Sequence, residues 1–82
     1  MIVMVRVMSI EELEKLIRRK YHILKPTRLE KIEVTEYLAV FKFSNGRVVL
    51  VAFDGFDAEK KLFVFEDEPL MVVATLRLSR ES

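Results

Sequence analysis

The chain has 82 residues, of which 14 are basic and 13 acidic, and it contains no cysteine. This length predicts one domain spanning residues 1–82, and the lack of thiols excludes a disulfide framework and a zinc–thiolate site. The near-balance of charge excludes the strongly basic make-up of a DNA-coating protein. Charged residues still make up 33% of the chain, with no Gln and a single Asn. That composition is typical of proteins from hyperthermophiles.

The apolar segment Met1–Met8 is too short to span a membrane. It also lacks the layout of a signal peptide, because Arg6 interrupts it and no small-residue cleavage site follows. We therefore expect a cytoplasmic protein without a membrane partner. The segment favours a strand, and its apolar residues at both parities predict that both faces are covered, either in the middle of a sheet or under a second layer.

A helix is predicted to start at Ser9, which forms an S-x-x-E capping box with Glu12. Acidic residues follow in the first turn and basic residues in the last, as the helix dipole favours. Pro26 is expected to end the helix at about Leu24. One apolar stripe repeats at helical spacing: Ile10, Leu13, Ile17, Tyr21 and Leu24.

The remainder of the chain favours strands. Residues 29–34 are either a short edge strand or an irregular connection. Asn45-Gly46 predicts a two-residue hairpin turn, because both residues tolerate positive φ. The expected strands are 37–43, 47–53, 62–66 and 70–78, with a polar loop at 54–61, a turn at 67–69 and a loose tail at Arg80–Ser82.

The predicted order is β-α-β-β-β-β(-β), an α+β fold. We expect one N-terminal helix packed on a strongly bent antiparallel sheet or on a small, partly open β-barrel. Residues 47–53 carry apolar side chains on both faces, and one helix covers only part of one face. Closure into a barrel, association into a homo-oligomer (a dimer or a ring), or both are expected to cover the rest.

The sequence offers few side chains for nucleophilic catalysis, since His22 is the sole histidine and no cysteine is present. Asp54, Asp57 and Glu59 lack the spacing of a calcium loop, so solvated carboxylates are expected there. We predict no catalytic residue, no metal and no cofactor. Four cations on the predicted helix are expected to face water, either as a solvated face or as contacts to nucleic-acid phosphates: Lys15, Arg18, Arg19 and Lys20.

The stretch from Phe41 to Asp67 resembles the first motif of Sm-like (Lsm) proteins. The matching positions are Gly46, Arg47, Phe56, Asp57, Leu62, Val64 and Asp67. The resemblance implies a small bent barrel that assembles into rings and binds single-stranded RNA through its loops, and it implies that Asp57 orders the loop after it. Lys60-Lys61 stands where the family has a Met-Asn pair, and Leu76-Arg77-Leu78 is the second-motif candidate, without its Gly. Lys60, Lys61 and Arg77 therefore join the candidate nucleic-acid contacts.

The sequence thus favours a non-enzymatic, self-assembling binding module with possible contact to RNA or DNA. A structural subunit that binds another protein, without nucleic acid, is the alternative. A carboxylate- or metal-dependent enzyme is the remote alternative.

Overall fold

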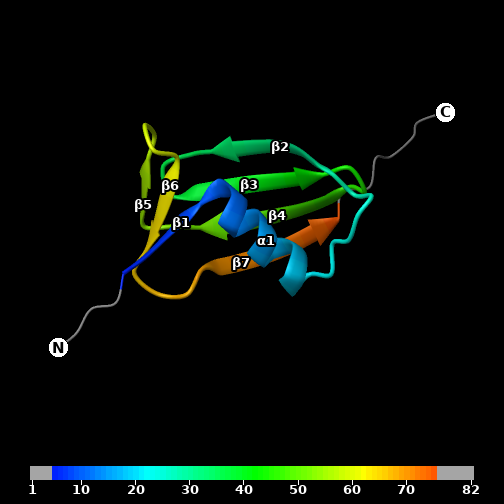
Figure 1. Cartoon of the computed structure of the whole chain (residues 1–82), viewed down its shortest axis with the longest axis horizontal. Helices are drawn as coiled ribbons and strands as arrows, with labels where there is room; N and C mark the ends of the chain where they lie inside the picture. The colour runs from blue at the N-terminus through cyan, green and yellow to red at the C-terminus, as the bar shows by residue number, and fades with distance from the viewer. Residues whose placement is uncertain (1–4, 76–82) are drawn as a thin grey trace.

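One helix and seven strands make up the part of the chain that the structure, a computed structural model, describes: residues 5–75 (Figure 1). The fold is α+β, as the sequence predicts. In chain order the elements are β1 (Arg6–Ser9), α1 (Ile10–Lys20), β2 (Leu29–Val34), β3 (Leu38–Phe43), β4 (Arg47–Ala52), β5 (Gly55–Asp57), β6 (Leu62–Phe65) and β7 (Leu70–Thr75).

The start of α1 is set by the predicted capping box. The Ser9 hydroxyl accepts a hydrogen bond from the Glu12 N–H at 3.1 Å, and Glu12 Oε1 accepts one from the Ser9 N–H at 3.0 Å. These bonds satisfy two backbone donors at the helix start. They also lower the pKa of the Glu12 carboxyl, chiefly through the backbone hydrogen bond at Ser9.

The helix ends at Lys20, four residues before the predicted position. His22 adopts a left-handed φ of 53°, and the Ile23 N–H returns to the Arg18 carbonyl at 2.9 Å. This is a Schellman-type termination, here without the usual glycine. Leu24 consequently lies outside the helix and is 72% exposed, so its predicted place in the apolar stripe is wrong, whereas Leu13 and Ile17 are fully buried.

The strands form two antiparallel sheets, with the orders β2-β3-β4-β7 and β1-β6-β5. Within residues 5–75 these sheets do not close into a barrel, so the expectation of one bent sheet or a partly open barrel is wrong. The chain leaves the larger sheet after β4 to form β5, where the Asp54 N–H donates to the Val64 carbonyl. After β6 it returns, and β7 pairs with β4 instead of continuing the smaller sheet.

Two strand predictions need correction. The expected polar loop at 54–61 contains β5, which pairs with β6 through Phe56 opposite Phe63. The described part of the predicted N-terminal strand, β1, lies at the edge of the smaller sheet, because within residues 5–75 it pairs with β6 alone; residues 1–4 lie outside the described residues. Val5 and Val7 are about half exposed, at 53% and 52%, so this strand is not covered on both faces as expected.

The predicted hairpin joins β3 to β4, but its turn differs in type. The Gly46 N–H donates to the Phe43 carbonyl at 3.0 Å, and Lys42 lies opposite Val48. Only Gly46 has positive φ, at 88°, and the Asn45 side chain accepts from the Arg47 N–H. The loop is therefore three residues long with a left-handed glycine at its end, not a two-residue turn.

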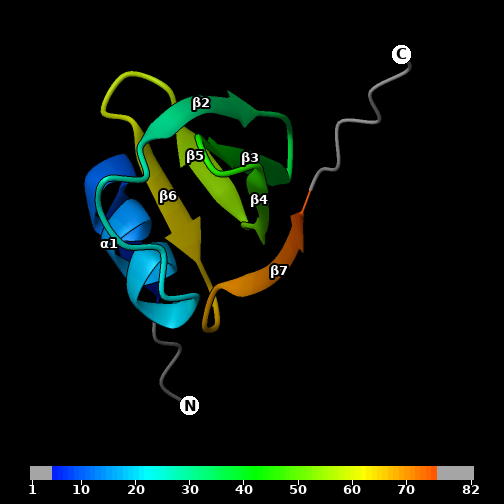
Figure 2. The same cartoon turned by 90° about the vertical axis from the view of Figure 1, so that its right-hand side faces the viewer.

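The core lies between the larger sheet and the layer formed by α1 and the smaller sheet. Figure 2 shows α1 and β6 on the same side of the β2-β3-β4-β7 sheet. Five phenylalanines belong to this core, and each is at most 5% exposed: Phe41, Phe43, Phe53, Phe63 and Phe65. No helix or strand of residues 5–75 covers the opposite side of the larger sheet (Figure 2).

Candidate interaction surface on the larger sheet

The outer side of the larger sheet is apolar over three adjacent strands. Side chains alternate along a strand, so Phe41 and Val49 point into the core and their neighbours point outward. The register aligns the outward side chains in rows across the sheet. We call the outward side chains of two such rows the open face: Leu38, Ala52 and Leu70 in one, and Val40, Leu50 and Val72 in the other.

Exposure of the open face increases toward the edge strand. Leu38 on β3 is 36% exposed, whereas Val72 and Leu70 on β7 are 58% and 71% exposed. In Figure 2 no helix or strand of residues 5–75 lies over this side of the sheet. A contiguous apolar surface of this kind marks an interaction site more often than a solvated face.

The open face stops at β2, where the outward side chains are charged. The Glu33 carboxylate lies 3.0 Å from the Lys31 ammonium and 3.1 Å from that of Lys42. The hydrogen bond from Lys31 and, to a lesser extent, that from Lys42 lower the pKa of the Glu33 carboxyl. The two rows of the open face are thus apolar, and they are bordered by Lys31 and Glu33 on β2 and Lys42 on β3.

The two edges of the larger sheet differ in the same way. The β2 edge contains Glu30, Lys31 and Glu33 and a register shift between Leu29 and Lys31. Charges and bulges on an edge strand are the usual protection against pairing with another chain. The β7 edge has the sequence Leu-Met-Val-Val-Ala-Thr, with no charge, and five of its six residues are exposed. It therefore lacks that protection.

The predicted cations group along α1, with one exception. Lys15, Arg19 and Lys20 are exposed, and the turn before β6 brings Lys60 and Lys61 beside Ser9, Ile10 and Glu11 at the helix start. Five of the predicted nucleic-acid contacts therefore follow one helix, although Glu11, Glu12 and Glu14 lie on it as well. Arg77 lies outside the described residues.

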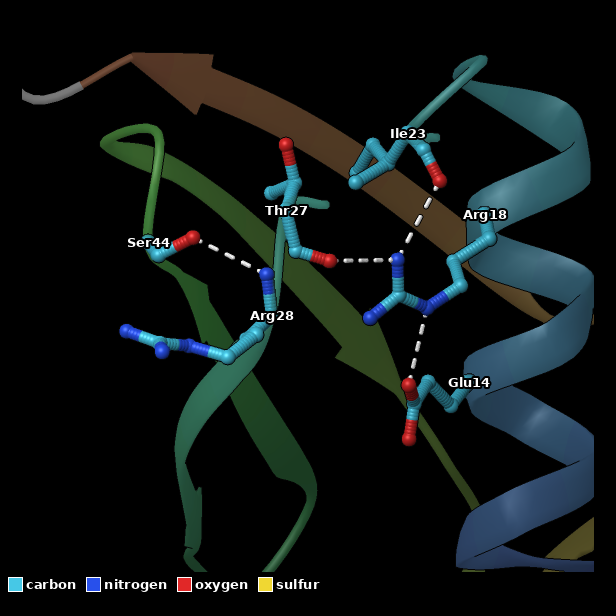
Figure 3. A network of polar contacts seen from close by, with 6 residues as sticks. All are labelled: Glu14, Arg18, Ile23, Thr27, Arg28 and Ser44. Carbon is cyan, nitrogen blue, oxygen red and sulfur yellow. Dashed lines mark hydrogen bonds and ion pairs between the residues drawn. The ribbon is translucent and has the colours of Figure 1, made fainter. Parts of the chain in front are cut away.

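Arg18 is the exception, because its guanidinium points into the fold (Figure 3). Its Nε donates to Glu14 Oε2 at 2.8 Å, and its Nη1 donates to the carbonyls of Ile23 at 3.3 Å and Thr27 at 2.9 Å. The guanidinium also lies 5.3 Å from the centroid of the Phe43 ring. The side chain is 22% exposed, so the expectation that it faces water is wrong.

The loop carboxylates bond to backbone. Asp57 Oδ1 accepts from the N–H groups of Glu59 and Lys60, which confirms that Asp57 orders the loop after it. Asp54 Oδ2 accepts from the Glu66 N–H at 2.7 Å. No group of three or more metal-ligating side chains lies together in residues 5–75. Nor does any helix in that range have the length and apolarity needed to cross a membrane.

Sequence reasoning gave the surplus of apolar strand surface but not its location. The register that aligns Leu38 with Ala52 and Leu70 is non-local, and no pattern within one strand reveals it. No protein-family model, no curated protein and no solved structure matches this chain. The Sm-like resemblance therefore stays a prediction.

Proposed function

We propose that this chain is a non-enzymatic, self-assembling binding module in which a second copy covers the open face. The observation that supports this most is the two apolar rows across β3, β4 and β7, with Leu70 and Val72 more than half exposed. Two sheets that pack face to face, about 10 Å apart, bury such rows in a common core.

The charged border supports a second copy as the occupant. Lys31 and Lys42 flank Glu33 at one side of the open face, so the border carries both signs. A two-fold axis brings the same surface of both copies together. The apolar rows of one copy then contact those of the other. Because the border carries both signs of charge, the two borders do not repel each other strongly. A different protein as the occupant, which is the structural-subunit alternative, is one outcome of the test below.

The expected association is weak if the face acts alone. Three strands about 4.8 Å apart and six residues long cover roughly 300 Å² in projection. A standard interface buries about 800 Å² of accessible surface on each partner. We therefore expect the population of dimer to rise with concentration over the micromolar range.

Light scattering on the purified chain tests the proposal. We expect two or more 9.7 kDa chains per particle at high concentration, and Leu38→Lys, which places a charge on the open face, should lower this mass. Leu24→Lys is the control, because Leu24 is exposed but lies on the α1–β2 connection. A monomer at every concentration contradicts self-assembly and leaves the structural-subunit alternative.

Contact with RNA or DNA is a second proposal, supported by the grouping of Lys60 and Lys61 with the exposed cations of α1. Lys15, Arg19 and Lys25 also line a shallow hollow of about 330 Å³ with the exposed Leu24. Cations along one helix bind phosphates with a strong dependence on salt. The dilution by glutamates predicts weak, sequence-independent binding.

Titration of a 20-nucleotide single-stranded RNA at two salt concentrations tests this second proposal. Lys15→Glu with Arg19→Glu should weaken binding about tenfold at low salt, since each lost phosphate contact removes counterion release. Arg6→Glu with Lys31→Glu makes the same change of net charge away from α1 and should weaken it less. Equal losses of affinity from both double variants, or no binding by the unaltered chain, would show that α1 is not a nucleic-acid-binding surface.

A further inference from the structure

The edge of β7 that faces away from β4, which pairs with no other strand of residues 5–75, is a second feature of the same surface. Each edge strand presents unpaired backbone N–H and C=O groups that another strand can pair with. We infer that β7 pairs antiparallel with β7 of a second copy, so that two four-stranded sheets join into one of eight strands. This inference rests on the proposed self-assembly and adds to the face-to-face contact a second one, at the edge of the sheet.

Among the four sheet edges in residues 5–75, β7 is the least protected. β5 is only three residues long, β1 has four residues and carries Arg6, and β2 is charged and irregular. β7 has six residues with neither a charge nor a proline. Pairing β7 with itself therefore places no like charges opposite each other and removes no ladder hydrogen bond.

The area of the open face supports a second contact. Roughly 300 Å² in projection is well below a standard interface, whereas joining two six-residue edges adds a ladder of backbone hydrogen bonds and new cross-strand contacts. Leu70, Val72 and Val73 are 71%, 58% and 38% exposed, so each has surface left to bury. The edge thus supplies contact that the face lacks.

Symmetry restricts the register of this pair. Residues directly opposite each other in an antiparallel pair lie on the same face of the sheet. A two-fold axis perpendicular to the sheet therefore lies midway between the two copies of one residue, and the middle of β7 makes that residue Val72 or Val73. In both cases the outward residues of the two copies lie on the same side, and the apolar rows run on from one copy into the next.

Cysteine cross-linking tests the pairing, because the chain has no cysteine of its own. In Met71→Cys with Val73→Cys the new thiols lie on the inner face of the sheet, which face-to-face packing does not bring together. With the axis at Val72, residue 71 lies opposite residue 73 of the second copy. With the axis at Val73, residue 73 lies opposite itself. Mild oxidation should therefore produce a covalent dimer of two 9.7 kDa chains in either register.

The matched control is Ile32→Cys with Val34→Cys, which has the same spacing and the same face on the charged β2 edge. We expect at least about five times more covalent dimer from the β7 pair, since disulfides require close Cα atoms. Equal yields from both edges would overturn the inference. An oligomer that light scattering detects but that gives no β7 cross-link would overturn it too, while leaving the proposed function intact. A strict monomer would overturn both.

Amide hydrogen exchange of the unaltered chain gives a second measurement, free of any folding defect in the variants. In a single chain the β7 amides that point away from β4 have no partner strand among residues 5–75, so we expect them to exchange fast. Pairing should slow their exchange by about tenfold or more as concentration rises into the oligomeric range. Exchange of the β2 amides should stay constant. Unchanged β7 exchange in an oligomeric sample would contradict the pairing.

Discussion

Arg18 Nη1 donates a hydrogen bond to the carbonyl oxygen of Thr27 at 2.9 Å, across nine positions of sequence. The same guanidinium holds Glu14 and the Ile23 carbonyl (Figure 3), while Arg47 from β4 donates to the Tyr21 carbonyl. Two arginines thus bind three carbonyls of the irregular connection between α1 and β2. Immediately after it, the Arg28 N–H donates to the Ser44 hydroxyl, and the Ser44 N–H donates to the Arg28 carbonyl.

We expect Arg18→Ala to destabilise the fold by about 2–4 kcal/mol, because it leaves part-buried carbonyls and Glu14 without their donor. Arg19→Ala is the control. Arg19 is the exposed neighbour, and its loss should cost at most about 0.5 kcal/mol. Urea denaturation of both variants measures the difference. Arg18→Lys should recover only part of the loss, since an ammonium cannot reproduce the fork geometry. Equal stability of the two alanine variants would contradict the structural role.

Leu70→Lys should reduce self-association much more than Leu24→Lys. The two leucines are 71% and 72% exposed, so the changes cost the single chain about equally, but only Leu70 lies on the open face and the β7 edge. A lysine at this position would lose its solvation in the interface, and it would be repelled by the same lysine of the second copy. Sedimentation equilibrium at matched concentrations measures the two dissociation constants. Equal effects would show that the apolar surface of β7 is not involved.

Gly46→Ala should destabilise the chain by about 1–2 kcal/mol, because Gly46 has a φ of 88°, which costs an L-residue about that much. The chain contains one other glycine, Gly55, which provides the comparison. A Cβ at Gly55 would lie 3.7 Å from the Val64 Cβ, an ordinary contact. Thermal unfolding should show a lower melting temperature for Gly46→Ala and little change for Gly55→Ala. The reverse order would contradict the turn described here.

The capping box should make stability depend on pH in the acid range. The Glu12 pKa is lowered from 4.5 in the fold, so the carboxylate stabilises the native state above that pH. This contribution is lost as the pH falls through the lowered folded-state value. Glu12→Gln mimics the protonated form. The melting temperatures of the two proteins should therefore differ most above about pH 5 and converge toward pH 3. A difference that is constant with pH would show that the charge does not matter.

Local signals in the sequence located the elements well. Ser9 and Glu12 placed the helix start within one residue, and Asn45-Gly46 placed the hairpin between β3 and β4. These features depend on backbone geometry and burial that neighbouring residues determine. The open alternative at 29–34 is settled in favour of the edge strand.

Features that depend on contacts between distant segments could not be predicted from the sequence. β5 is three residues long with polar neighbours, so only its pairing with β6 makes it a strand. The left-handed residue that follows the helix is His22 and not a glycine, and the tertiary contacts of Arg18 override the helical spacing that predicted an exposed side chain. The division into two sheets follows from the return of β7 to β4, a pairing of distant segments. The candidate surface follows from that same pairing.

The irregular, charged edge of β2 has a consequence for the size of any assembly. A sheet whose two edge strands can both pair with another copy can add copies at each edge and grow into a fibril. Lys31, Glu33 and the register shift disfavour pairing at the β2 edge, so β7 is the one edge of the larger sheet suited to pairing. A single β7–β7 contact then occupies that edge in both copies. In the inferred pairing β2 thus limits the assembly to two joined sheets, so that the apolar β7 can associate without further growth into amyloid.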